Sequence, residues 1–315
     1  SKAGALYGRA QKIKISPFKY KDFRLMFKEL DEEEKALRYG VFGGTPFYLE
    51  KTKPFKHTLD AIYELVIKKD SELSEEPKNL LEYENVRVHS KYNSILQSIS
   101  AGKEVLKEIQ DFTKMPVSNI PPYITKLDTL LDLVKRNDPL NGKERLGRYK
   151  ITDNFFRFWY KFVFENQSAL NMGARDKILN IIKNELNAYI GKIFEDIIKE
   201  LLILYNGEEI NHHKIDFENI GSWWDRNNNE VDILAYNAKE KTFIVGEVKW
   251  SSEKLDADIV EELARKSKLV GLSGEYKMLF ISKNGFTERA IKRMDEIKAL
   301  YFDLDSVGRL FDKYG

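Results

Sequence analysis

Two stretches decide the fold of this chain: EVDILAYN at residues 230–237 and TFIVGEVKW at residues 242–250. Both are rich in Val, Ile and aromatic residues, and a short polar segment separates them, so the pattern predicts adjacent strands over 231–236 and 242–248. Asp232 lies in the first stretch, and Glu247 and Lys249 lie near the end of the second. Because side chains alternate along a strand, Glu247 and Lys249 point to the same face. A charged set is therefore expected at the end of a buried sheet.

This charged set has the composition of a metal site. Carboxylates on adjacent strands, here Asp232 and Glu247, are the oxygen ligands that Mg²⁺ or Mn²⁺ prefers, and the Val248 carbonyl is a further candidate ligand. A metal held there would polarise a phosphate and lower the pKa of a bound water. Lys249 would orient that water or offset negative charge in the transition state. Glu195, on the preceding helix, would contact the metal or its water. The sequence thus predicts Glu195, Asp232, Glu247 and Lys249 as catalytic residues of a metal-dependent nuclease of the PD-(D/E)xK type.

A structural alternative stays open for the same residues. Charged residues make up 32% of the chain, so a short ExK pattern is common by chance, and cross-strand ion pairs at the end of a sheet are ordinary. The order of the elements favours the nuclease interpretation, because a helix with Glu195 precedes a strand with Asp232 and then a strand with Glu247 and Lys249.

The rest of the C-terminal segment alternates between helical and strand patterns. Helices are expected over 189–205, 257–268 and 287–299, and strands over 277–281 and 299–303. Such alternation predicts an α/β domain with a central mixed sheet over residues 188–315. The pair His212-His213 has no partner at metal-ligand spacing and is interpreted as a surface feature. The pair Trp223-Trp224 is expected to pack at the edge of the sheet, and contact with a nucleotide is the alternative.

The first half of the chain has helical periodicity. Residues 16–88 form one helical region, interrupted by GGTP at 43–46. Residues 89–152 contain three short helices, the third extending through Val134, followed by a Gly-containing basic loop and a returning strand at 149–151. This is the outline of a winged helix-turn-helix. Residues 153–187 are dense in aromatic side chains and are expected to form a helical connector.

The basic loop of the expected winged helix is the strongest electrostatic signal. Residues 135–150 hold six basic side chains against Asp138 and Glu144, a local charge of +4. The predicted DNA-binding residues are Lys135, Arg136, Lys143, Arg145, Arg148 and Lys150. The alternative is a solvated hairpin on a module that only holds domains together.

Bulk composition excludes several kinds of site. The chain of 315 residues has no cysteine, which rules out disulfides, thiolate metal sites and a cysteine nucleophile. A net charge of +2 does not by itself predict nucleic-acid binding. No apolar run approaches the length of a membrane span. The polar start without Met suggests a cut inside a larger protein, and a cytoplasmic location is expected.

The chain resembles archaeal-type P-loop ATPases of the AAA+/STAND group that end in a nuclease-like domain of unassigned function. The resemblance covers nearly all 315 residues and rests on LYGR (6–9), GGTPFYL (43–49), YNSIL (92–96), GRYKITD (147–153), FWY (158–160), YIGKIFE (189–195), EVD (230–232) and GEVK (246–249). It implies that residues 1–15 are the remnant of the ATPase core and 16–88 its helical lid. Residues 89–152 would be the winged helix, 153–187 the connector, and 188–315 a restriction-endonuclease-like domain.

The resemblance also marks what this chain lacks. No Walker A pattern G-x-x-x-x-G-K-[ST] occurs in it, so ATP binding is expected only in a parent protein that carries the nucleotide-binding core. Arg9 falls where such ATPases place an arginine near the nucleotide, but no phosphate loop accompanies it.

The leading hypothesis is therefore the C-terminal part of a DNA-associated ATPase. Its winged helix would bind double-stranded or branched DNA, and its nuclease-like domain would cleave or bind that DNA with Mg²⁺ or Mn²⁺. The ATPase core, or another copy of the protein, is a further expected partner. One alternative is a non-catalytic regulatory or protein-interaction arm of a STAND-type ATPase with an inactive nuclease fold. A second is a transcription factor that uses only the winged helix.

Overall fold

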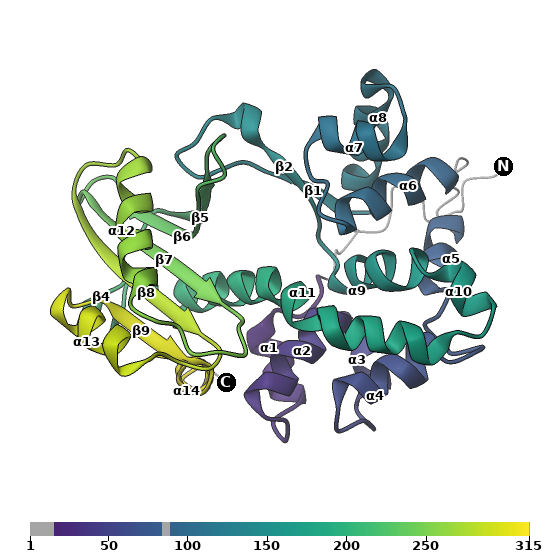
Figure 1. Cartoon of the computed structure of the whole chain (residues 1–315), viewed down its shortest axis with the longest axis horizontal. Coiled ribbons are helices and arrows are strands. Elements are labelled where there is room, and N and C mark those ends of the chain that lie inside the picture. Colours follow the sequence, from purple (N-terminus) through teal and green to yellow (C-terminus); the bar gives the residue numbers. More distant parts are fainter. Residues whose placement is uncertain (1–15, 84–88, 315) are drawn as a thin grey trace, which may run out of the picture.

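The chain combines an N-terminal helical region with a five-stranded mixed sheet covered by helices (Figure 1). The computed structural model describes residues 16–83 and 89–314. The expected remnant of an ATPase core at residues 1–15, including Arg9, lies outside the described residues. Within the described part of the chain, no helix is both long enough and apolar enough to cross a membrane.

Six short helical elements make up the first region. They are α1 (Tyr20–Met26), α2 (Glu32–Phe42), α3 (Pro46–Thr52), α4 (Thr58–Ile62), the π-helical turn η1 (Tyr63–Ile67) and α5 (Glu76–Tyr83). The break between α2 and α3 has a local cause. Gly43 has a φ of +67°, and a Cβ on Gly44 would lie 1.9 Å from the Phe18 carbonyl oxygen. Only glycine fits at both positions, and Pro46 then starts the next helix.

A second group of helices leads into a hairpin. It contains α6 (His89–Ser100), α7 (Leu106–Thr113), the 3₁₀ turn η2 (Val117–Asn119) and α8 (Ile120–Thr129), followed by β1 (Val134–Asn137), the turn η3 (Glu144–Leu146) and β2 (Arg148–Ile151). Strands β1 and β2 pair antiparallel, from Val134 opposite Ile151 to Asn137 opposite Arg148. The expected third helix ends five residues before Val134. Asp132 adopts a φ of +53°, so the chain turns there and Val134 begins a strand.

One long helix joins the helical region to the sheet. The aromatic-rich segment forms α9 (Asn154–Phe158), the π-helical turn η4 (Trp159–Phe164) and α10 (Gln167–Asn171), and α11 (Arg175–Leu204) follows. At 30 residues, α11 is about 45 Å long. It contacts α2, η4 and α10 as well as β6 and β7. The expected domain boundary between residues 187 and 188 falls inside this continuous helix. The helix does not break there because the buried face of α11 extends from Ile178 to Leu202.

The sheet has the order β5-β6-β7-β8-β9. Its strands are β5 (Asn219–Trp224), β6 (Glu230–Asn237), β7 (Thr242–Lys249), β8 (Glu275–Ser282) and β9 (Leu300–Asp303). The pairs β5/β6 and β6/β7 are antiparallel, and β7/β8 and β8/β9 are parallel. Helices α12 (Asp258–Leu269) and α13 (Glu288–Glu296) share an apolar cluster with one face. Helices α11 and α14 (Leu304–Asp312) share the main core with the other. A short hairpin, β3 (Glu209–Ile210) with β4 (His213–Lys214), lies between α11 and the sheet in sequence.

Candidate functional site

Asp232 lies at a bulge in strand β6. Trp223 of β5 pairs with Val231 and Gly221 pairs with Leu234, so Asp232 and Ile233 together oppose only Ser222. Bulges of this kind re-aim side chains and often occur beside functional sites. The Ser222 hydroxyl donates to the Asp232 carbonyl at 2.8 Å, and the Asp232 carboxylate accepts from the Val248 N–H at 2.9 Å. Val248, expected to offer its carbonyl to a metal, thus contacts the carboxylate through its N–H.

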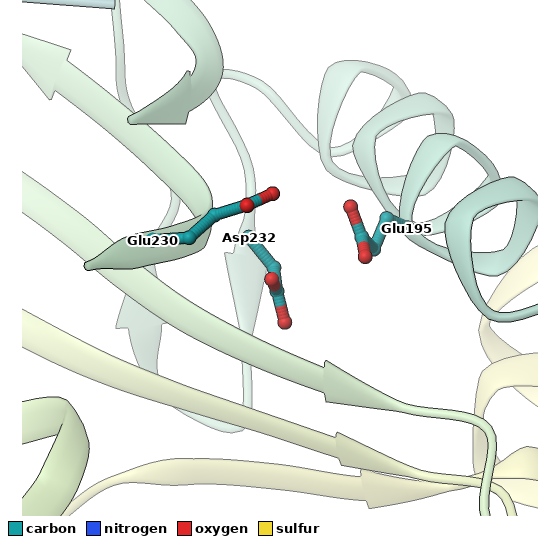
Figure 2. A group of neighbouring side chains, drawn as sticks. All are labelled: Glu195, Glu230 and Asp232. Carbon is teal, nitrogen blue, oxygen red and sulfur yellow. The ribbon is translucent and has the colours of Figure 1, made fainter. Parts of the chain in front are cut away.

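Glu195, Glu230 and Asp232 form a group of three neighbouring carboxylates (Figure 2). Each offers one oxygen, and these oxygens lie within 4.8 Å of one another. Glu195 comes from α11 and the other two come from β6. Glu230 was not among the predicted site residues. Its signal was its position two residues before Asp232, which on a strand favours the same face.

The group lies in a partly desolvated environment. Glu195 is 8% exposed and Asp232 is 5% exposed. Burial and the negative charge of Asp232 raise the pKa of Glu195 from 4.5 to about 7, although Lys192 and Lys199 oppose that rise. Removing a carboxylate from water and placing it beside another disfavours its charged form. A bound cation would offset both the burial and the repulsion by Asp232, and it would lower the pKa of Glu195.

Glu247 and Lys249 lie beside this group rather than inside it. Lys249 Nζ is 2.5 Å from Glu247 Oε1 and 3.5 Å from Asp232 Oδ2, so the lysine bridges the two carboxylates expected to share a metal. Lys266 of α12 contacts Glu247 Oε2 at 3.2 Å. Glu247, 4% exposed, shares a strand face with Val245, which packs in the cluster under α12. Burial alone would lower the pKa of Lys249, but Asp232 and Glu247 hold it above its ordinary value.

Two cations compensate Glu195 and Glu230, in addition to Lys249 beside Asp232. Lys192, one turn before Glu195 on α11, contacts Glu230 Oε1 at 2.5 Å and Glu195 Oε1 at 3.2 Å. Arg148 of β2 contacts Glu230 Oε2 at 3.1 Å. Burial would raise the pKa of Glu230, but Lys192 and Arg148 together lower it. A metal at this group would take over charge compensation that the two side chains provide here.

The six predicted DNA-binding residues occupy two kinds of environment. Four make ion pairs within the chain: Lys135 with Asp128 and Asp132, Arg136 with Asp138, Arg148 with Glu230, and Lys150 with Asp196. The other two, Lys143 and Arg145, are exposed near the tip of the hairpin and carry no ion pair with the described residues. Two of the four paired residues, Arg148 and Lys150, are directed at the α11 and β6 side of the molecule.

The two remaining pairs of residues singled out in the sequence lie outside the three-carboxylate group. His212 and His213 lie on the β3–β4 hairpin, and no metal-binding group among the described residues includes them. Trp223 and Trp224 are buried on the edge strand β5. Trp224 Nε1 donates to the Leu146 carbonyl at 2.9 Å, and the Arg148 guanidinium lies 4.5 Å above its ring. This second tryptophan packs against the β1–β2 hairpin.

A model of a known protein family matches part of this region. Residues 159–262 match DUF234, a family of archaeal and bacterial proteins of unknown function. The DUF234 segment runs from η4 into α12 and contains Glu195, Glu230, Asp232, Glu247 and Lys249.

A longer relative extends the similarity. The chain is 36% identical over 307 residues to the uncharacterized protein MJECL04 of Methanocaldococcus jannaschii. The match covers 95% of this chain and 66% of the relative, so the chain spans about two thirds of that protein's length. No solved structure matches the chain.

Proposed function

We propose that this chain is the C-terminal part of a DNA-associated P-loop ATPase, and that its α/β region is a metal-dependent nuclease-like domain. The observation that carries the proposal is the junction of α11, β6 and β7. There, Asp232 at a bulged strand end meets Glu195 and Glu230 within 4.8 Å and Lys249 at 3.5 Å. A helix with Glu195, then a strand with Asp232 and a strand with Lys249 in a mixed sheet, is also the order expected of a restriction-endonuclease-like domain.

The donor set fits a hard divalent cation. Glu195, Glu230 and Asp232 offer only carboxylate oxygens, which suit Mg²⁺ or Mn²⁺ better than a softer metal. Such an ion, when bound, supplies a polarised phosphate and a water of lowered pKa. Lys249, beside Asp232, would hold positive charge close to the reacting phosphate. Glu195 would be ionised once a cation compensates Asp232, and it would then contact the metal or orient a water on it.

The order of the helical elements and the resemblance to P-loop ATPases with a winged helix both support a nucleic-acid role for the helical region. Helices α6, α7 and α8 followed by the β1–β2 hairpin have the element order of a winged helix, and α1 to α5 would be the lid of the ATPase. Lys143 and Arg145 are the exposed cations that would meet the phosphates of double-stranded or branched DNA first. ATP would bind only to the core of the parent protein.

A cleavage assay tests this function. Plasmid, linear and branched DNA are incubated with the chain and Mn²⁺, in parallel with Asp232→Asn/Glu247→Gln, which removes two charges while keeping side-chain shape. The matched control, Glu253→Ala/Glu275→Ala, removes two exposed carboxylates elsewhere in the α/β region. We expect cleavage by the wild type and the control only. Equal cleavage by the site variant, or none by any protein, would refute the catalytic proposal.

One observation favours a second function, a non-catalytic regulatory or interaction arm. Glu247 is paired with both Lys249 and Lys266 and is absent from the three-carboxylate group, so this carboxylate is already compensated without a metal. Calorimetry with Mn²⁺ separates the two functions. The nuclease proposal requires binding that Asp232→Asn abolishes, whereas the regulatory arm requires no binding.

A further inference from the structure

The β1–β2 hairpin is docked on the α/β region. We name residues 134–151 the wing. The Leu140 N–H donates to the Ser222 carbonyl at 2.8 Å, and the Asn141 side chain donates to the Val270 carbonyl at 3.0 Å. Leu140 also lies directly over Gly221, where a Cβ would be 3.2 Å from the Leu140 Cβ. The wing therefore attaches to the exposed edge of β5, the kind of free strand edge that proteins usually cover.

The base of the wing reaches the three-carboxylate group. Arg148 stacks on Trp224 and pairs with Glu230, and Lys150 pairs with Asp196, the residue that follows Glu195. These residues line a cavity of about 60 Å³ between the wing, α11 and β6. Since one water needs roughly 10–15 Å³ of such space, the cavity holds a few waters at most. The docked wing therefore narrows the approach to Glu195 and Glu230 from this side.

The docked wing also competes with a cation. Glu230 has one oxygen on Arg148 and the other on Lys192, so both of its oxygens are already engaged. A metal needs at least one of these oxygens together with Glu195 and Asp232. Releasing the wing would remove Arg148 from Glu230 and uncover the cavity in a single movement.

We propose that the wing is an autoinhibitory cover for the nuclease-like site, and that DNA bound at its tip lifts it. This inference rests on the proposed function, since it concerns access to two of the same carboxylates, Glu195 and Glu230. Lys143 and Arg145 are exposed beyond the docked part of the wing, so duplex phosphates reach them while the cover is closed. Lifting frees Arg148 and Lys150 for two further phosphates and opens Glu230 to a metal.

An engineered disulfide tests the cover directly. The chain has no cysteine, so Leu140→Cys/Gly221→Cys creates its only two thiols. Their Cβ atoms would start 3.2 Å apart, close to the roughly 3.5–4.5 Å of a disulfide. We expect the oxidised protein to lose at least about nine tenths of its Mn²⁺-dependent DNA cleavage, and reduction to restore it. Wild type and Leu140→Cys alone, under the same oxidant and reductant, are the controls. Equal cleavage in the cross-linked and reduced states would overturn the cover.

Calorimetry gives a readout that does not depend on catalysis. Arg148→Gln should bind Mn²⁺ several-fold more tightly than the wild type, because it removes a cation that competes for Glu230. Arg226→Gln, an exposed arginine in the β5–β6 turn, should bind Mn²⁺ with wild-type affinity. Equal Mn²⁺ affinities for wild type and Arg148→Gln would contradict the proposal that the wing is an autoinhibitory cover. They would not contradict the proposed metal site. Absence of Mn²⁺ binding in every protein refutes the proposed function and the cover together.

Discussion

Glu195→Gln should stabilise the protein at high pH and leave its stability unchanged at low pH. The folded chain holds the pKa of Glu195 at about 7, whereas the unfolded chain has the ordinary value of 4.5. Below pH 4.5, both states are protonated and the contribution of this carboxyl to stability is fully present. As the pH rises from 4.5 to 7, the unfolded state ionises first, so that stability is lost.

The size of the effect follows from the two pKa values. A tenfold change in an ionisation constant is worth 1.36 kcal/mol, so the difference between 4.5 and about 7 corresponds to about 3 kcal/mol. Because Glu195 is only 8% exposed, solvent screening reduces this value little. Glutamine cannot ionise, so the variant should be more stable than the wild type by up to about 3 kcal/mol at pH 8. The difference should vanish near pH 4.

Urea denaturation of both proteins at pH 4.5, 6 and 8 measures this difference. Comparison of wild type and variant at each pH cancels titrating groups that do not interact with Glu195, such as the buried Asp153, whose pKa burial raises to about 6. Glu253→Gln, an exposed glutamate in the loop after β7, is the matched control and should show no pH-dependent gain. A gain for Glu195→Gln that is equal at all three pH values, or a loss at pH 8, would refute the electrostatic account.

Three more properties of the chain can be measured, at the three-carboxylate group, in the sheet and at the tip of the wing. At pH 6, Mn²⁺ binding should release about 0.9 proton from Glu195, falling to about 0.1 at pH 8, as calorimetry in buffers of different ionisation enthalpy measures. Gly246→Ala should destabilise the chain by roughly 1–3 kcal/mol, because its Cβ would lie 2.9 Å from the Ile233 Cβ in the middle of the sheet; denaturation midpoints test this. Lys143→Ala/Arg145→Ala should reduce the slope of log affinity for duplex DNA against log salt by about 2, and an unchanged slope would exclude the wing tip as the DNA contact.

The strands of the site could be predicted from the sequence because they are buried on both faces. Strand β7, TFIVGEVK, is continuously apolar up to Glu247, and burial runs through it from Phe243 to Val248. Strand β5 was missed. Its residues NIGSWW show no alternation and contain a glycine, and this edge strand is completed by the wing from far away in the sequence. Long-range pairing of this kind leaves no local pattern.

The site itself was predictable only as a set of residues. The order of Glu195, Asp232 and Lys249 along the chain indicated that they would meet, and the structure brings them to one junction. Which carboxylates lie close together depends on the packing of α11 against β6, and that packing joins residues far apart in the sequence. Glu247 instead pairs with Lys249 and Lys266, so it lies outside the group.

Counting charges along the sequence overestimates the positive charge that the wing offers to DNA. A count along residues 135–150 gives +4, but Glu230 and Asp196 lie outside that window and pair with Arg148 and Lys150. The charge that the sequence offers to DNA is thus partly committed to the α/β region in the docked state. Any DNA that binds the lifted wing recovers those two cations, so it binds the lifted state more tightly than the docked one. By linkage, DNA then favours metal binding at the carboxylates to the same extent that the metal favours DNA binding.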